Sequence, residues 1–271
     1  MPAQAEKAQH FLELHHRDAP LLMPNAWDAG AAKLLASLGF DALATTSSGH
    51  AATLGRLDGS VTRDEALSHA ATIVAATELP VSADLENAFG DGAEEVAETV
   101  SLAIGTGLAG CSVEDYTGRQ DEPIYDFALA RERIAAAVEA AHAGPVQLVL
   151  TARAENYLHG RKDLANTIAR LEAYQEAGAD VLYAPGLASV EEIRSVLESV
   201  DRPVNVLAVP GAPPVNELAE LGVSRVSVGG AFAFNALGAL IEAARELRDQ
   251  GTYEYATRAG VGLKAAREAF S

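Results

Sequence analysis

The stretch from residue 81 to residue 114, VSADLENAFGDGAEEVAETVSLAIGTGLAGCSVE, contains the unit that decides the fold. The apolar run Val81–Leu85 is followed by a polar loop, an alanine-rich helical pattern over Glu94–Gly105 and a second apolar run, Gly110–Glu114. Short apolar runs separated by helices are typical of parallel strands that are covered on both faces. The stretch therefore predicts a strand, a crossover helix and a second strand parallel to the first.

The same period continues on both sides of this unit. Further strands are expected at Leu21–Asn25, Ala42–Thr46, Leu148–Ala152, Val181–Ala184, Val204–Leu207 and Val226–Val228, and further helices at Asp28–Leu38, Arg63–Ala76 and Leu129–His142. Eight such units without a break in composition favour a closed (β/α)8 TIM barrel over an open doubly wound sheet. We expect a single α/β domain over residues 1–271, with an extra helix in residues 1–20, the barrel over about 20–248 and a helical tail over about 253–271.

The composition limits the classes of partner. The chain carries 38 acidic and 20 basic residues, a formal net charge of −18, so a nucleic-acid partner is not expected. The single cysteine, Cys111, rules out a disulfide framework, and we expect it to be buried in its strand. We find no secretory pattern and no apolar segment of membrane length, which predicts a cytoplasmic enzyme without a membrane partner. An anionic substrate would need a metal ion or a well-placed arginine to bind such an acidic chain.

Charged or donor-rich residues stand where four of the predicted strands end. They are Asp84 and Glu86, Glu114 and Asp115, Arg153 and Glu155, and the small residues of Thr45–Gly49. Catalytic residues of TIM barrels occupy this end of the strands. Carboxylates that converge there would repel one another unless a hard divalent cation lies between them, and oxygen ligands favour Mg²⁺ or Mn²⁺ over zinc. The alternative is that these acids form structural ion pairs with Arg153 and loop bases.

Two further polar residues are weaker candidates for a site. His50, which follows the Ser-Gly turn, is either a site residue or a packing residue, and Asn205 at the end of the seventh strand is a candidate polar contact. The other histidines have no metal-binding spacing and are expected at the surface or on helix faces: His10, His15, His16, His69, His142 and His159.

The runs quoted so far resemble the isocitrate lyase/phosphoenolpyruvate mutase superfamily. The resemblance rests on Thr46–Gly49, Leu54–Asp58, Asp84–Gly90, Ser112–Asp115 and Ala152–Glu155, in the same order and spacing between about Met23 and Ala239. It implies a Mg²⁺-dependent barrel that acts on 2-oxo or enol carboxylates through an enolate-type intermediate.

The resemblance also implies a role for each matching residue. Asp84 matches the direct metal ligand, and the other metal-side carboxylates, which hold metal-bound waters, are Asp58, Glu86 and Glu114. The segment that binds the substrate carboxylate corresponds to Ser48, Gly49 and His50, while Arg153 matches the arginine that grips the carboxylate and the 2-oxo oxygen. Arg153, Glu114 and Asp58 are thus the expected catalytic groups. Members commonly form tetramers that swap a C-terminal helix, so a homotetramer or dimer built through Tyr253–Phe270 is expected.

The loop after the fourth strand departs from the superfamily pattern. Residues 116–123 read YTGRQDEP, without the Lys-Arg-Cys-Gly-His segment of the isocitrate and methylisocitrate lyases, so those two activities are not expected. The phosphonate-processing members carry Lys and Asn on this loop and a histidine after strand six. Here the loop offers only Arg119 and Gln120, and Ala184-Pro185-Gly186 stands in place of the histidine. Phosphoryl transfer needs more cations than this.

The leading hypothesis is therefore a lyase or decarboxylase for a small 2-oxo or 2-hydroxy dicarboxylate resembling oxaloacetate. One alternative is a phosphonopyruvate- or phosphoenolpyruvate-processing enzyme, a mutase or hydrolase with a variant loop. Another is a non-catalytic protein that binds a 2-oxo acid such as 2-oxoglutarate. Tyr116, Arg119 and bound water remain open as the proton donor.

Overall fold

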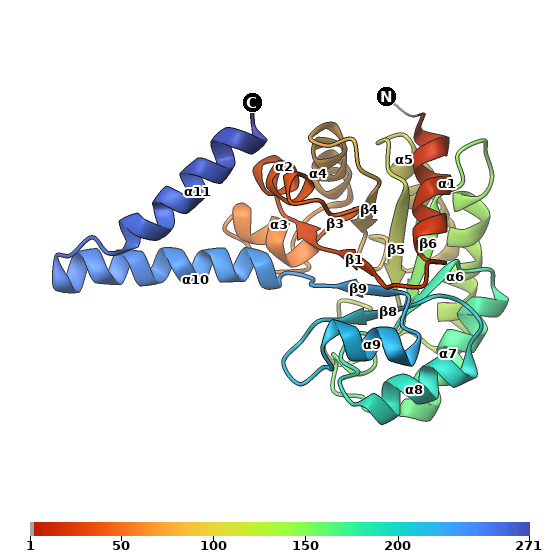
Figure 1. Cartoon of the computed structure of the whole chain (residues 1–271). Helices are drawn as coiled ribbons and strands as arrows, with labels where there is room; N and C mark the ends of the chain where they lie inside the picture. The colour runs from red at the N-terminus through yellow and green to blue at the C-terminus, as the bar shows by residue number, and fades with distance from the viewer. Residues whose placement is uncertain (1–2) are drawn as a thin grey trace.

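The computed structural model describes residues 3–271 and shows a barrel of parallel strands surrounded by helices (Figure 1). The strands are β1 (Leu21–Met23), β2 (Asn25–Ala26), β3 (Leu43–Thr45), β4 (Val81–Asp84), β5 (Gly110–Glu114), β6 (Val149–Arg153), β7 (Val181–Tyr183), β8 (Val204–Leu207) and β9 (Arg225–Ser227). The helices are α1 (Gln4–Leu14), α2 (Ala29–Ser37), α3 (Ser47–Thr53), α4 (Arg63–Ala75), α5 (Ala93–Ile104), α6 (Phe127–Ala141), α7 (Leu164–Glu176), α8 (Val190–Ser199), α9 (Val215–Leu221), α10 (Ala231–Arg245) and α11 (Tyr255–Ala269).

The nine strand segments make up the eight strands of the barrel. β1 and β2 are consecutive pieces of one extended stretch, interrupted at Pro24, which has no N–H to donate to a ladder. β1 pairs with β9 and β2 pairs with β3, so this stretch joins the two ends of the sheet and closes the barrel. The predicted (β/α)8 barrel is confirmed, and the predicted strands agree with the observed ones to within one residue at each end.

Helix α1 closes the N-terminal end of the barrel. Its buried residues Ala8, Phe11 and Leu14 pack against the first residues of several strands, among them Leu21 and Val149. The predicted extra helix is thus confirmed, and it covers the end of the barrel opposite the charged strand ends. Cys111 is buried inside β5, as the sequence predicts.

His15, expected at the surface or on a helix face, is instead a buried residue at the end of α1. This residue, which caps the C-terminus of α1, is only 2% exposed. Its Nε2 lies 3.2 Å from the Nη1 of Arg225, and its Nδ1 lies 2.7 Å from the carbonyl oxygen of Phe11. Because an arginine can only donate, Nε2 must accept and Nδ1 must carry the proton. Burial, together with the charge of Arg225, lowers the pKa of His15 to about 3.

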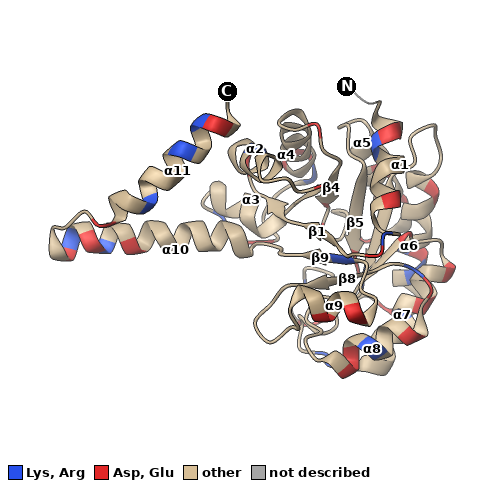
Figure 2. Ribbon diagram, viewed as in Figure 1, with Lys and Arg blue, Asp and Glu red and all other residues tan. Residues whose placement is uncertain are grey.

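Helix α10 leaves the barrel, and α11 turns back toward it, so the two form a projecting arm over residues 231–271 (Figure 1). A π-helical turn, Glu246–Gln250, and the left-handed Gly251 separate them. The helix predicted for the tail is therefore present as α11, which contacts α2. No helix within residues 3–271 has the length and apolar character that crossing a membrane requires. Figure 2 shows acidic positions on the outer helices α1, α7 and α8.

His15→Gln is expected to make stability less dependent on pH. A histidine whose pKa is lowered on folding binds a proton more readily when unfolded, so stability is lost as the pH falls from about 6.5 toward 3. One proton contributes up to about 1.4 kcal/mol per pH unit in that window. Urea unfolding at pH 7, 6 and 5 should show a smaller fall for the variant. An equal fall in both proteins would contradict the neutral, buried state of this ring.

Candidate active site

Arg153 at the end of β6 forms the centre of a carboxylate cluster. Its guanidinium donates to Asp84 Oδ1 at 2.8 Å, and its Nη2 lies 3.0 Å from Glu114 Oε2 and 2.8 Å from Glu155 Oε1. These partners come from the ends of β4, β5 and β6, as predicted from the charged strand ends. Two more carboxylates, Asp58 and Glu86, belong to the same group, since Asp84 raises the pKa of each.

This cluster is short of positive charge. Burial, followed by the charges of Asp84 and Asp58, raises the pKa of Glu86 to about 8. Burial also raises the pKa of Glu114 well above its usual value, although Arg153 opposes the shift. The pKa of Asp58 is raised by partial desolvation and by Asp84. One guanidinium does not neutralise five acids, so a further cation would be strongly attracted to this position.

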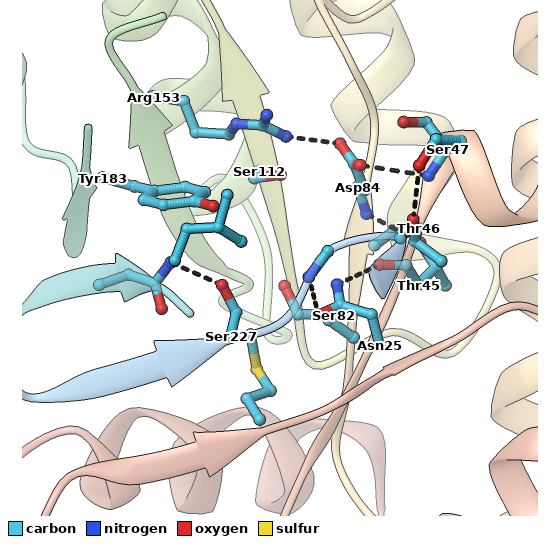
Figure 3. A pocket seen from close by; sticks show the side chains of 18 of the residues that line it. Asn25, Thr45, Thr46, Ser47, Ser82, Asp84, Ser112, Arg153, Tyr183 and Ser227 are labelled. Carbon is cyan, nitrogen blue, oxygen red and sulfur yellow. Dashed lines mark hydrogen bonds and ion pairs between the residues drawn. The ribbon is translucent and has the colours of Figure 1, made fainter. Parts of the chain in front are cut away.

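Asp84 connects the arginine to the start of α3 (Figure 3). Its second oxygen accepts from the backbone N–H of Ser47 at 3.2 Å, and its own N–H donates to Thr45 Oγ1 at 2.9 Å. Thr46 caps α3 by accepting from the N–H of Gly49 at 3.3 Å. These bonds orient Asp84 from the β3 side, while Arg153 of β6 holds its other oxygen.

The loop after β4 has an unusual backbone. Three residues without the freedom of glycine have positive φ angles: Glu86 at 50°, Ala88 at 61° and Phe89 at 61°. Such angles cost energy and persist only where neighbours impose them. Arg133 of α6 is one such neighbour, because its buried guanidinium donates to the carbonyl oxygens of Asn87, Gly90 and Asp91. Arg133 of α6 thereby holds the loop that carries Glu86 in place.

Asp115 follows Glu114 in sequence but has a different role. It is 1% exposed and accepts from Arg170 at 3.0 Å, from the Tyr174 hydroxyl at 2.6 Å and from the N–H of Glu155 at 2.8 Å. The carboxylate is therefore fully used within the protein. For Asp115, the alternative of a structural ion pair is therefore the correct one. Through its bond to the N–H of Glu155, this carboxylate also fixes the segment that carries Glu155.

The loop between β5 and α6 lies over the cluster. Arg119 pairs with both oxygens of Asp91 at 3.0–3.1 Å, and Thr117 N–H donates to Pro123 O at 2.8 Å. The ring of Tyr116 stacks on His159 with 3.7 Å between centroids. His159 Nε2 lies 3.7 Å from Glu155, so this histidine, expected at the surface or on a helix face, in fact stands beside the carboxylates.

A cavity of about 180 Å³ leads from the cluster into the barrel. Among its lining residues are Ser48, Asp58, Asp84, Arg153 and Asn205. The amide of Asn205 is already engaged, since it donates to Ser227 Oγ at 2.9 Å and accepts from Arg225 at 2.9 Å. Asn205 therefore shapes the cavity and keeps its neighbours in place.

Ser48 lines the cavity, whereas Gly49 and His50 are not among its lining residues. The His50 ring stacks on His69 at 3.8 Å and lines a separate hollow beside Trp27. Gly49 packs tightly, because a Cβ there would lie 2.6 Å from Thr46 Cγ2. The N–H groups of Gly49 and His50 both bond to Thr46.

The donor set fits a hard divalent cation. The five carboxylates of the cluster offer oxygen ligands, and burial, followed by neighbouring negative charges, raises the pKa of Asp58, Glu86 and Glu114. Within residues 3–271, no three His, Cys, Asp or Glu side chains converge closely enough to enclose an ion.

Sequence reasoning named Glu155 at a strand end but gave it no role, and it did not assign His159 or Tyr183 to the site. Glu155 and His159 follow β6, and the alternation of Arg153 with Glu155 was a signal for the first of them. Tyr183 lies under Arg153, with 5.3 Å from Cζ to the ring centroid. Nothing in the local sequence distinguishes Tyr183 from an ordinary core residue.

The family model for phosphoenolpyruvate phosphomutase matches residues 11–248. A solved lyase/mutase candidate from Burkholderia cenocepacia J2315 is 55% identical with a TM-score of 0.92, and the match covers 94% of this chain and 92% of that one. The 2-methylisocitrate lyase of Halalkalibacterium halodurans is 32% identical over 74% of this chain and 67% of its own. The oxaloacetate decarboxylase of Pseudomonas fluorescens is 29% identical over 88% of this chain and 83% of its own.

Arg170→Met is expected to destabilise the protein by about 3–5 kcal/mol, because it leaves the buried Asp115 carboxylate without its ion-pair partner. Arg63→Met is the matched control, since Arg63 pairs with Glu98 at the surface and its loss should change little. Chemical unfolding of the two variants measures the difference. Similar losses from both would mean that the Asp115 pair is not structural.

Proposed function

Since the chain belongs to the phosphoenolpyruvate phosphomutase family, we propose that it is a Mg²⁺-dependent lyase or decarboxylase for a small 2-oxo or 2-hydroxy dicarboxylate resembling oxaloacetate. The observation that carries the proposal is the cluster itself. Five carboxylates surround one guanidinium beside a polar cavity, an arrangement that favours both a divalent cation and an anionic substrate.

Asp84 would hold the ion directly, and Asp58, Glu86 and Glu114 would hold it through water. Mn²⁺ has the same ligand preferences and could replace Mg²⁺. When bound, the ion would supply positive charge that stabilises an enolate oxygen.

The protein residues would bind and orient the substrate. Arg153, which lines the cavity, would grip the carboxylate and the 2-oxo oxygen, and the Ser48 hydroxyl would add a donor. For a 2-oxo substrate, breaking the C3–C4 bond leaves its electron pair on C3 as the enolate and releases carbon dioxide. For a 2-hydroxy substrate, the hydroxyl loses its proton and the C2–C3 bond breaks, so that C2 becomes the 2-oxo carbon of one product and the electron pair stays on C3 as the enolate of the other. A proton must then reach C3, and the stacked Tyr116 and His159 lie beside the carboxylates, where they could deliver it.

The arrangement of Arg119 favours carbon–carbon chemistry over phosphoryl transfer. Phosphoryl transfer needs cations around the moving oxygens. Arg119 is the cation expected on this loop. Its guanidinium pairs with both carboxylate oxygens of Asp91 and does not line the cavity. A phosphonopyruvate- or phosphoenolpyruvate-processing activity is therefore the second candidate.

Proton NMR of the purified protein with a panel of substrates tests the proposal. The panel contains oxaloacetate, 2-methyl- and 2-hydroxy-dicarboxylates, phosphonopyruvate and phosphoenolpyruvate, each with Mg²⁺ or with chelator. Samples without protein correct for decarboxylation of oxaloacetate by the metal alone. Pyruvate that forms faster only with protein and Mg²⁺ supports a lyase. Line broadening of 2-oxo acids without turnover would instead favour a binding protein.

Asp84→Ala is expected to lower the Mg²⁺-dependent rate at least about 100-fold, because it removes the proposed direct ligand. Glu98→Gln is the control, since this exposed carboxylate on α5 pairs only with Arg63. Initial rates over a Mg²⁺ titration separate weaker metal binding from slower turnover. Unchanged Mg²⁺ dependence in Asp84→Ala would refute the metal assignment.

The projecting arm is proposed to join copies of this chain into a homotetramer or dimer. Large apolar side chains on it are exposed: Phe232, Phe234, Leu237, Leu240, Ile241, Leu247, Val261 and Leu263. A row of apolar residues on a projecting helix pair is typical of a surface that another chain covers.

Leu240→Glu combined with Ile241→Glu is expected to reduce the molar mass to that of a smaller species in light scattering. Burying two carboxylates in an apolar interface is strongly unfavourable. Leu38→Glu is the control, because Leu38 is 72% exposed on the barrel itself. A mass equal to one chain for the unmodified protein at micromolar concentration would refute the assembly.

A further inference from the structure

The interior of the barrel is unusually polar. Inward positions of TIM barrels are dominated by bulky branched side chains. Here three of them are serines that line the cavity below the carboxylate cluster, Ser82, Ser112 and Ser227 (Figure 3). Small side chains leave space where valine or isoleucine would fill it, so the cavity extends from Asp84 and Arg153 down into the barrel.

At the inner part of this cavity lies a buried cation without an acidic partner. Arg225, the first residue of β9, is 3% exposed and lines the cavity. Its hydrogen bonds go to neutral acceptors, Asn205 Oδ1 at 2.9 Å, Thr151 Oγ1 at 3.1 Å and the neutral ring of His15 at 3.2 Å. It forms no ion pair with any residue in the range 3–271. Burial, despite the nearby Tyr183 hydroxyl, lowers its pKa to about 9.

Several polar atoms around the cavity have no protein partner. Within the described chain, Nη2 of Arg225 and the hydroxyls of Ser82 and Ser112 make no hydrogen bond. The one fully enclosed polar side-chain atom without a partner in residues 3–271 is Asn156 Oδ1. The three cavity atoms therefore retain accessible surface, and since their residues are buried, this surface faces the cavity.

We propose that Arg225, Ser82 and Ser112 form an inner carboxylate subsite, so that the site selects dicarboxylates with one end at Arg153 and the other at Arg225. A buried guanidinium without a counter-ion is unfavourable, and a carboxylate would offset its charge. The two hydroxyls and the free Nη2 of Arg225 can donate hydrogen bonds to the oxygens of a carboxylate.

This subsite deepens the proposed function, but its binding test does not depend on turnover. The probes are succinate and butyrate, which have equal carbon length and differ in one carboxylate. Their dissociation constants are measured by calorimetry on the full-length protein, with chelator and with Mg²⁺. Succinate should bind at least about 10-fold more tightly than butyrate, as a buried charge-assisted hydrogen bond allows. Equal affinities in both conditions would overturn the subsite.

Arg225→Gln should abolish the preference for succinate, and Arg225→Lys should retain part of it. A merely structural arginine would lower the melting temperature of Arg225→Gln without changing the ratio of the two affinities. Ser82→Val provides a second route, because it fills the cavity and leaves every hydrogen bond of Arg225 in place. Its matched control is Ser101→Val on the exposed face of α5. An unchanged ratio in Ser82→Val and in Arg225→Gln would overturn the proposal.

The two proposals fail in different ways. If no dicarboxylate is turned over but the succinate preference depends on Arg225, the inner subsite stands and the lyase proposal falls. If oxaloacetate is turned over with unchanged kcat/KM in Arg225→Gln, the lyase proposal stands and the subsite falls.

Discussion

The contact of one guanidinium with three carboxylates is the interaction on which the mouth of this barrel depends. Arg153 holds Asp84, Glu114 and Glu155 at 2.8–3.0 Å, and these acids belong to three successive strands. Without the arginine the strand ends would repel one another. With it the cluster still holds five carboxyl groups for one guanidinium, and burial, followed by the charges of Asp84 and Asp58, raises the pKa of Glu86 to about 8. The same contact therefore holds the strand ends together and leaves the site able to attract a cation.

Two other arginines support this centre without belonging to it. Arg133 fixes the strained loop around Glu86 through backbone carbonyl groups, and Arg170 neutralises the buried Asp115 under the loop that carries Glu155. Both come from helices on the outside of the barrel. Glu86 and Glu155 are thus positioned with the help of side chains from the outer helices, and the positions of these two acids depend on how those helices pack.

Local patterns were enough to predict the barrel and the charged strand ends. A period of apolar run and amphipathic helix depends only on neighbours in sequence, and so does the appearance of Asp84, Glu114 and Arg153 where a strand ends. The other features depend on contacts between distant parts of the chain. His15 is buried against Arg225, and these two partners are 210 positions apart in sequence. The His50 ring is turned aside by stacking on His69 of the next helix. Whether Asp115 or Glu114 faces the site follows from the tertiary partner each one finds, and no local pattern encodes that partner.

Helix α1 seals the N-terminal end of the barrel, which makes the cavity a dead end. A molecule that reaches Arg225 must enter and leave past Arg153 and the loop that carries Tyr116. Both fragments of a cleaved molecule would therefore leave through the same opening. If a bound molecule were cut in two, the fragment nearer the mouth would have to depart first, and the inner fragment could be trapped by a fresh molecule arriving behind it. The order of release would then be imposed by the architecture of the barrel and not by the relative affinities of the two products.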